Sequence, residues 1–255
     1  MSVTFASEAL SGRLIVITGA SSGLGRASAV FLSELGARIV LVGRSTDKLE
    51  QVAAALSGTG HMIKAADLSD DDTADKLIKS VVLQCGAIDG LFHSAGNSSV
   101  MPIRLTKRSH IDNMFGAAVF GSLGISRALA RKGAMRDGGS IVFMTSVSAL
   151  RGRKGMVAYS AAKAATSGLL RALAIELAER RIRVNGIAAG AVATEMHESF
   201  VKSVDHQMVQ NYELLHPLGF GLPSDIANTV AFLMSDASQW ITGVNLSVDG
   251  GYAAK

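Results

Sequence analysis

The chain has 255 residues but contains little cysteine, proline or aromatic material. Its single cysteine, Cys85, excludes an internal disulfide, so we expect a protein of the reducing cytoplasm. Aromatic residues make up 5% of the sequence and hydrophobic residues 48%, so the core must be built mainly from Ala, Val, Leu and Ile. Aliphatic cores of this kind are typical of buried parallel strands.

Several classes of partner are also excluded by what is missing. No apolar run approaches 18 residues, so we expect no membrane span, and residues 1–10 lack the basic and apolar regions of a secretory signal. The net charge is only +4, and the basic residues are scattered apart from small clusters at 151–154 and 180–183. We therefore expect neither nucleic acid nor membrane as a partner, and no metal site is expected.

Apolar runs typical of strands alternate with helical patterns along the whole chain. This alternation predicts βαβ units and a parallel sheet covered by helices on both faces, which is a doubly wound, Rossmann-like α/β fold. We expect seven strands in the spatial order 3-2-1-4-5-6-7, within one domain spanning residues 1–255. The expected strands are residues 14–18, 38–42, 61–65, 88–93, 140–145, 183–188 and 245–248, and the expected helices are residues 24–35, 47–56, 71–85, 112–131, 157–179 and 224–234.

A glycine-rich turn follows the first apolar run. The segment Thr18-Gly19-Ala20-Ser21-Ser22-Gly23-Leu24-Gly25 joins the first expected strand to the first expected helix. Glycines here let the backbone approach a pyrophosphate, which the free N–H groups and the dipole of a helix N-terminus attract. The glycine spacing differs from the usual G-x-G-x-x-G, and tight turns need glycine anyway, so this turn alone does not establish a dinucleotide site.

Tyr159 and Lys163 are four residues apart in an expected helix and therefore share one face. A nearby lysine cation favours the phenolate and lowers a tyrosine pKa from about 10 toward neutrality, which suits the tyrosine to acid and base chemistry. Ser146 ends the apolar run at 141–145, where a hydroxyl would face the ligand crevice of an open α/β sheet. Each feature alone is common, but their succession after the glycine turn favours an active site.

These segments, with several others, resemble the short-chain dehydrogenase/reductase family of the classical type, and in places its oxoacyl-carrier-protein-reductase-like members. The resemblance covers essentially the whole chain. Its further motifs are Asp67-Leu68, Ala95-Gly96, Arg183-Val184-Asn185, Val192-x-Thr194 and Val248-Asp249-Gly250-Gly251. The resemblance implies a ketoreductase-type oxidoreductase that moves a hydride between a nicotinamide cofactor and a small carbonyl or alcohol substrate. It also implies a homo-oligomer, expected to be a tetramer.

The family pattern implies a role for each matched residue. Tyr159 would be the acid/base, Lys163 would hold the nicotinamide ribose, and Ser146 would donate a hydrogen bond to the substrate oxygen. Asp67 would meet the adenine edge. The implied cofactor-binding residues are Gly19, Ser21, Ser22, Gly23, Leu24, Gly25, Arg44, Asp67, Leu68, Ser94, Ala95, Gly96, Tyr159, Lys163, Gly190, Val192 and Thr194.

Cofactor choice is expected to depend on the residues after the second strand. An acidic residue there would bind the ribose 2′-hydroxyl of NAD, whereas an arginine accommodates the 2′-phosphate of NADP. The chain has Gly43 at the acidic position, and Arg44 follows it. This favours NADP(H), with NAD(H) still possible; the alternative is that Arg44 is a solvent-facing arginine at a helix start.

Three segments depart from the family pattern. The family asparagine in the helix before Ser146 is expected to help hold a water for proton relay, and counting back from Gly121 places Ala118 there. Asn113, five residues earlier, has poor helical phase to substitute for it. The family's Asn-Asn-Ala-Gly after the fourth strand is His93-Ser94-Ala95-Gly96 here, and its Pro-Gly after the sixth strand is Ala189-Gly190. These changes put the relay in doubt more than cofactor binding, because the backbone donors and acceptors remain.

Residues 194–216 contain no expected strand, yet Met196, Phe200, Val204, Met208, Tyr212 and Leu215 recur at helical spacing. A long insertion after a strand is expected to form a substrate lid, the alternative being a helical hairpin that closes the core. The substrate itself stays open, because Arg151, Arg153 and Lys154 suit either an anionic group or a solvated basic turn. The alternative function is a cofactor-binding sensor or scaffold with little turnover.

Overall fold

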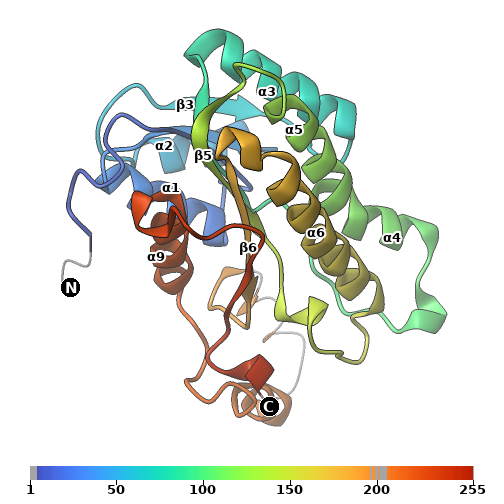
Figure 1. Cartoon of the computed structure of the whole chain (residues 1–255). Coiled ribbons are helices and arrows are strands. Elements are labelled where there is room, and N and C mark those ends of the chain that lie inside the picture. Colours follow the sequence, from blue (N-terminus) through green and yellow to red (C-terminus); the bar gives the residue numbers. More distant parts are fainter. Residues whose placement is uncertain (1–4, 196, 199–200, 202–205, 255) are drawn as a thin grey trace.

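Seven parallel strands form one sheet in the order β3-β2-β1-β4-β5-β6-β7, which confirms the predicted α/β fold and strand order (Figure 1). The computed structural model describes residues 5–195, 197–198, 201 and 206–254. The strands are β1 (Leu14–Thr18), β2 (Arg38–Gly43), β3 (Met62–Ala65), β4 (Ile88–His93), β5 (Met135–Met144), β6 (Arg183–Ala189) and β7 (Asn245–Val248).

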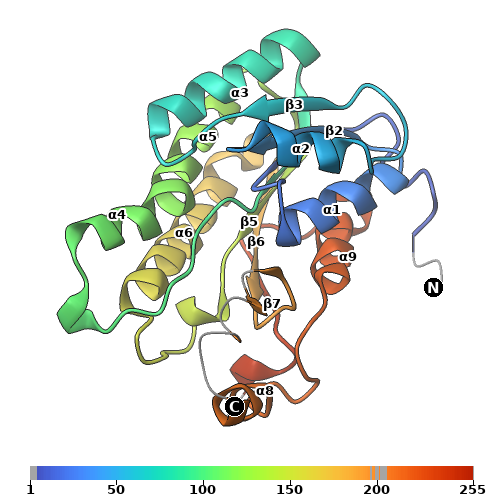
Figure 2. The same cartoon turned by 180° about the vertical axis from the view of Figure 1, so that it is seen from behind.

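Helices cover both faces of the sheet, with α3, α5 and α6 on one face and α1 and α9 on the other (Figures 1 and 2). The α-helices are α1 (Gly23–Glu34), α2 (Thr46–Ala53), α3 (Asp71–Cys85), α4 (Arg108–Phe115), α5 (Ser122–Leu129), α6 (Val157–Glu176), α8 (His206–Glu213) and α9 (Pro223–Met234). In the part of the chain that the structure describes, every helix is too short or too polar to traverse a lipid bilayer.

The first strand shows why the sheet is buried on both sides. All five residues of β1 are buried, and successive side chains point to opposite faces. Ile15 and Ile17 pack with α1 and α9, whereas Leu14 and Val16 pack with α3 and α5. A strand between two helical layers must therefore be apolar at every position, and it cannot show the alternating pattern of a half-exposed strand.

The helix expected over residues 112–131 is interrupted. The chain instead forms α4, a π-helical segment (Gly116–Gly121) and α5. Glycines let this part of the chain pack closely against residues 68–71. A side chain at Gly121 would collide with the carbonyl oxygen of Leu68, and one at Gly124 with that of Asp71. The apolar spacing of α and π turns is similar, so periodicity predicted one continuous helix.

Several expected boundaries were displaced, and part of the 194–216 insertion is described. The fifth strand begins at Met135 rather than at residue 140, with a register shift against β4 between Ile88 and Gly90. The helix expected to reach residue 179 ends at Glu176, and a 3-10 turn, Ala178–Arg180, follows it. Within the insertion, α8 confirms helical structure; Met196, Phe200 and Val204 lie outside the described residues.

Candidate active site

The glycine turn between β1 and α1 packs directly against the turn that follows β4. Gly19 has φ +65°, and a side chain on it would lie 2.9 Å from the backbone nitrogen of Ala95. A side chain on Gly25 would collide with the carbonyl oxygen of Gly19. Both positions therefore require glycine, and α1 begins at Gly23 with its N-terminus at the carboxyl end of β1.

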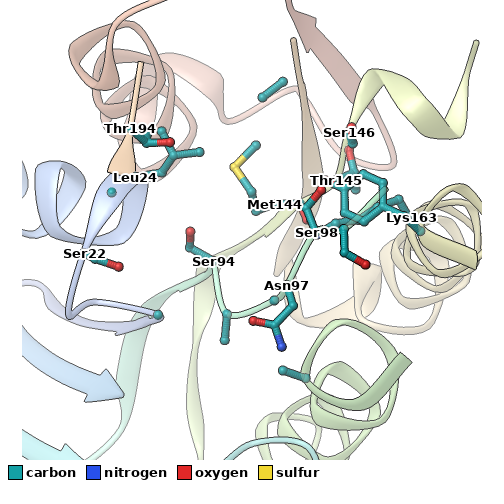
Figure 3. Close-up of a pocket in the computed structure, with 18 of the residues that line it drawn as sticks. Ser22, Leu24, Ser94, Asn97, Ser98, Met144, Thr145, Ser146, Lys163 and Thr194 are labelled. Atoms are coloured by element: carbon teal, nitrogen blue, oxygen red, sulfur yellow. The ribbon is translucent and has the colours of Figure 1, made fainter. Parts of the chain in front are cut away.

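A cleft of roughly 1200 Å³ lies along the carboxyl ends of the strands. It spans the point between β1 and β4 where the strand order reverses, the usual ligand position in open α/β sheets. In Figure 3, Ser22 and Leu24 lie at one end of this cleft, and Ser146 and Lys163 at the other. All the expected cofactor-binding residues line it except Gly25, which packs beneath the turn.

The structure brings Ser146, Tyr159 and Lys163 together at the second end of the cleft. Ser146 follows β5, and its Oγ accepts a hydrogen bond from the backbone nitrogen of Ser148 at 3.1 Å and lies close enough to the Tyr159 hydroxyl to lower its pKa. Lys163, one turn after Tyr159 in α6, is buried, and its Nζ donates to the carbonyl oxygen of Met144 at 2.8 Å. The chain therefore places a hydroxyl pair and an ammonium group at one point.

The charge states of this group differ from the simple expectation. Burial raises the pKa of Tyr159 above its ordinary value, and its hydrogen bond with Ser146 only partly opposes this. Burial lowers the pKa of Lys163 to about 8. Burial therefore dominates the pKa of Tyr159, and the expected lowering by Lys163, whose Nζ lies 5.8 Å from the Tyr159 ring centroid, is not among the causes of the shift. Tyr159 consequently holds its proton at pH 7 and can act as a donor.

Ala118 lies beside this group. A Cβ added to Gly96 would lie 3.5 Å from Nζ of Lys163 and 3.9 Å from Cβ of Ala118. The carbonyl oxygen of Ala118 accepts hydrogen bonds from the hydroxyls of Ser122 at 2.7 Å and Thr166 at 3.0 Å. Ala118 thus has a methyl group near Gly96 that packs with Ala162 and Tyr159, and its carbonyl oxygen is bonded within the protein.

Some residues of the cleft were not found from the sequence. The carboxylate of Glu195 accepts a hydrogen bond from the backbone nitrogen of Gly23 at 3.1 Å and pairs with Arg26 at 2.7 Å. Asn97 donates to Asn113 at 2.7 Å, and both side chains line the cleft. No local sequence pattern identifies Glu195 or Asn97 as site residues, because the tertiary fold, and not a sequence motif, brings each of them to the cleft.

The basic residues that follow Ser146 separate in the structure. Arg151 donates to the carbonyl oxygen of Tyr252 at 2.7 Å, and the side chain of Lys154 is exposed. Arg153 lines the cleft, as do Tyr212 of α8 and His197. Figure 2 shows α8 beside the C-terminal turn, and the rings of Tyr212 and Tyr252 are 6.2 Å apart. One basic residue of the three therefore belongs to the site.

Comparisons with known proteins agree with this geometry. Residues 19–253 match the family described as enoyl-(acyl carrier protein) reductase. The chain is 33% identical over 240 residues to carbonyl reductase family member 4 of Danio rerio, covering 94% of this chain and 97% of that protein. It is also 33% identical over 239 residues to a 3-oxoacyl-(acyl-carrier-protein) reductase of Staphylococcus epidermidis, covering 92% and 97%.

The solved structure of a short-chain dehydrogenase/reductase from Serratia marcescens superposes with a TM-score of 0.89 at 29% identity, covering 96% of this chain and 99% of that chain. A doubly wound sheet with a glycine turn and a Tyr-x-x-x-Lys helix defines an NAD(P)-dependent oxidoreductase class. The chain belongs to the short-chain dehydrogenase/reductase family, which confirms the expected family and enzyme class.

Proposed function

We propose that this protein is an NADP(H)-dependent oxidoreductase that interconverts a carbonyl compound and a secondary alcohol. The observation that carries the proposal is the placement of Ser146, Tyr159 and Lys163 at one end of a cleft whose other end is the glycine turn. A dinucleotide would extend from the turn to this group. The relatives named as carbonyl and oxoacyl reductases support the same reaction type.

The residues of the cleft fit a dinucleotide. Gly19 and Gly25 let the turn pack tightly against the turn after β4 and onto itself, and the N-terminus of α1 offers backbone N–H groups to a pyrophosphate. Ser94, Ala95, Gly96, Gly190, Val192 and Thr194 would complete the cofactor site from the ends of β4 and β6. Asp67 would meet the adenine, and hydrogen bonds with Ser69 lower its pKa, with a smaller contribution from Arg44.

Preference for NADP(H) rests on the residues at the end of β2. Arg44 is exposed and lines the cleft near Asp67, so its guanidinium can bind a 2′-phosphate. Gly43 stands where an acidic residue would select NAD(H), and a Cβ at Gly43 would lie 3.2 Å from Leu49. The tight packing disfavours a side chain there.

In the proposed reduction, Tyr159 donates its proton to the carbonyl oxygen of the substrate, and Ser146 donates a hydrogen bond to the same oxygen. When bound, the nicotinamide cofactor supplies the hydride to the carbonyl carbon. Lys163 would hold the nicotinamide ribose and stabilise the tyrosinate left after proton transfer. Because burial already disfavours that anion, the ammonium of Lys163 is needed close to it.

Two larger features complete the proposal. Residues 194–216 would form a lid over the substrate, since Thr194, Glu195, His197 and Tyr212 all line the cleft. The chain would assemble as a homotetramer, because the exposed apolar side chains include two groups on separate elements. Leu123 and Val157 are 50% and 51% exposed on α5 and α6, and Trp240 is 97% exposed before the edge strand β7.

The direct test is to compare wild type with Tyr159→Phe in NADPH oxidation against a panel of carbonyl compounds. We expect the variant to lose about 10²–10⁴-fold in kcat while its Kd for NADPH stays within about threefold, because only the proton donor is removed. Equal kcat for the two proteins would contradict the assigned role. A wild type that binds NADPH but turns over no carbonyl of the panel would instead support the sensor or scaffold function.

A further inference from the structure

Residues 96–101, which follow the turn after β4, pass directly beside the proposed catalytic group. At the start of this segment, a Cβ added to Gly96 would lie 3.5 Å from Nζ of Lys163. At its end, the backbone nitrogen of the last residue donates to the carbonyl oxygen of Gly155 at 2.8 Å, just before α6 begins. Tyr159 lies in α6 between these two points of contact. The middle of the segment therefore borders the space in which the Tyr159 hydroxyl would meet a carbonyl group.

Both neighbours of Ser98 in this segment are tied to α4. The amide of Asn97 donates to that of Asn113 at 2.7 Å. Oγ of Ser99 lies 3.4 Å from Nδ1 of His110. These contacts hold the segment on both sides of Ser98, whose side chain lines the cleft.

Ser98 carries a hydroxyl that the protein does not use. Within the part of the chain that the structure describes, this side chain makes no hydrogen bond, although the residue is half-buried. In Figure 3, Ser98 lies on the same side of the cleft as Ser146 and Lys163. A hydroxyl can both donate and accept a hydrogen bond, so Ser98 can bind an oxygen of a ligand in the cleft.

The neighbouring amide pair extends the same chemistry away from the catalytic group. The single bond between Asn97 and Asn113 leaves an amide oxygen on one residue and an amide NH2 group on the other. Both side chains line the cleft with Ser98. A hydroxyl group of a ligand matches such a surface, because it donates and accepts in the same way. An alkyl chain at this place would leave Ser98 without a partner, which costs free energy when water is displaced.

We propose that the substrate is a hydroxylated carbonyl compound, and that Ser98 binds a hydroxyl group near the carbonyl that Tyr159 serves. This inference rests on the proposed oxidoreductase function and names the substrate class within it. An α- or β-hydroxy ketone has this chemistry. Its reduction consumes NADPH and a proton and yields a diol and NADP+. In this role Ser98 is a specificity-determining residue.

The test uses pairs of ketones in which a hydroxyl group replaces a methyl group. The pairs are hydroxyacetone with butanone, dihydroxyacetone with diethyl ketone, and 4-hydroxybutan-2-one with pentan-2-one. Kinetics with NADPH, and Kd for NADPH, are recorded for wild type, Ser98→Ala, Ser98→Thr and Ser109→Ala. Ser109 is an exposed serine of α4 outside the cleft, so its variant controls for the loss of a hydroxyl. Because a hydroxyl also changes the intrinsic reactivity of a ketone, the ratio of kcat/KM within each pair is compared between proteins.

We expect Ser98→Ala to lower this ratio about 3- to 10-fold in at least one pair, the size of one neutral hydrogen bond. The change should come through KM for the hydroxylated member, with the alkyl member changed by less than about twofold. Ser98→Thr keeps a hydroxyl and should keep most of the wild-type ratio, and Ser109→Ala should keep all of it.

A ratio that Ser98→Ala leaves unchanged in every pair would overturn the inference. Equal losses for both members of each pair would be one such result and would show a merely structural serine. A higher Kd for NADPH with an unchanged ratio would be another and would place the Ser98 hydroxyl on the cofactor. In both cases the measured turnover leaves the proposed function standing. NADPH binding without turnover of any ketone would instead remove the proposed function, and the inference with it.

Discussion

Nε2 of His93 lies 2.8 Å from the carbonyl oxygen of Ala117, and this contact determines the protonation of the imidazole. A carbonyl only accepts, so Nε2 carries the proton and Nδ1 accepts from the Thr18 hydroxyl at 2.8 Å. Oγ1 of Thr18 in turn accepts from the backbone nitrogen of Ala95 at 3.2 Å. One neutral histidine therefore ties together β1, the turn after β4 and the π-helical segment.

His93 should make stability depend on pH. Burial lowers its pKa to about 4, whereas the unfolded chain has the ordinary value of 6.5. Between these pH values the unfolded chain binds a proton that the native protein does not, so the free energy of unfolding should fall as the pH drops from 6.5 to about 4. His93→Asn keeps a donor for Ala117 and removes the titration. Denaturant unfolding at several pH values should show a shallower fall for His93→Asn; a slope equal to that of wild type would contradict it.

Arg44 should select the cofactor. Arg44→Ala removes the cation proposed to bind the 2′-phosphate, and losing a charge-assisted contact costs about 1.5–3 kcal/mol. We therefore expect Kd for NADPH to rise about 10-fold or more, and Kd for NADH to change little. Fluorescence titration measures both constants, and Lys48→Ala, on the neighbouring exposed turn of α2, is the control. Equal affinities for the two cofactors in wild type would show that Arg44 only faces solvent.

Glu195 should weaken cofactor binding. Its carboxylate bonds to the backbone nitrogen of Gly23 at the N-terminus of α1, where the pyrophosphate is proposed to lie. Two anions at one helix N-terminus repel each other, so Glu195→Gln should tighten NADPH binding about 3- to 10-fold at low salt, with a smaller gain as salt screens the repulsion. Calorimetry with NADPH at two salt concentrations tests this, with Glu198→Gln as the exposed control. Weaker binding in Glu195→Gln would mean that Glu195 holds the lid closed over the cofactor.

The exposed apolar residues should be buried in solution by contacts between subunits of the proposed tetramer. Light scattering at micromolar concentration should give the mass of a tetramer, and Trp240→Glu should give a dimer, because a charge placed in one of two interfaces leaves the other intact. Leu123→Glu, in the other region, should also give a dimer, and the double variant a monomer. A monomeric wild type would contradict the proposed assembly.

The strand order and the two helical layers could be predicted because they depend on patterns local to each segment. Runs such as Leu14–Thr18 are apolar throughout, and short connections between alternating elements leave few topologies. The π-helical segment could not be predicted, since it depends on Gly121 fitting against Leu68, more than fifty residues away in the chain. The sequence motifs identified the residues of the proposed catalytic group. The raised pKa of Tyr159 and the contact of Glu195 with Gly23 could not be predicted, because they arise only from burial and packing.

Ala118 provides the sharpest test of the proton supply. Its methyl group lies near Gly96 and packs with Tyr159, at the position to which the resemblance assigns the asparagine of the proton relay, and its carbonyl bonds to Ser122 and Thr166. Tyr159 can donate its own proton without that asparagine. Only the route by which a new proton reaches Tyr159 should therefore differ from that in family members that have the asparagine. We expect Ala118→Asn to leave kcat unchanged or to raise it, with Kd for NADPH unaffected. Ala118→Leu adds similar volume without an amide, and we expect it to lower kcat. If Ala118→Asn lowers kcat as strongly as Ala118→Leu while NADPH binding stays intact, then residue 118 is a packing position and protons reach Tyr159 by a route that does not pass beside it.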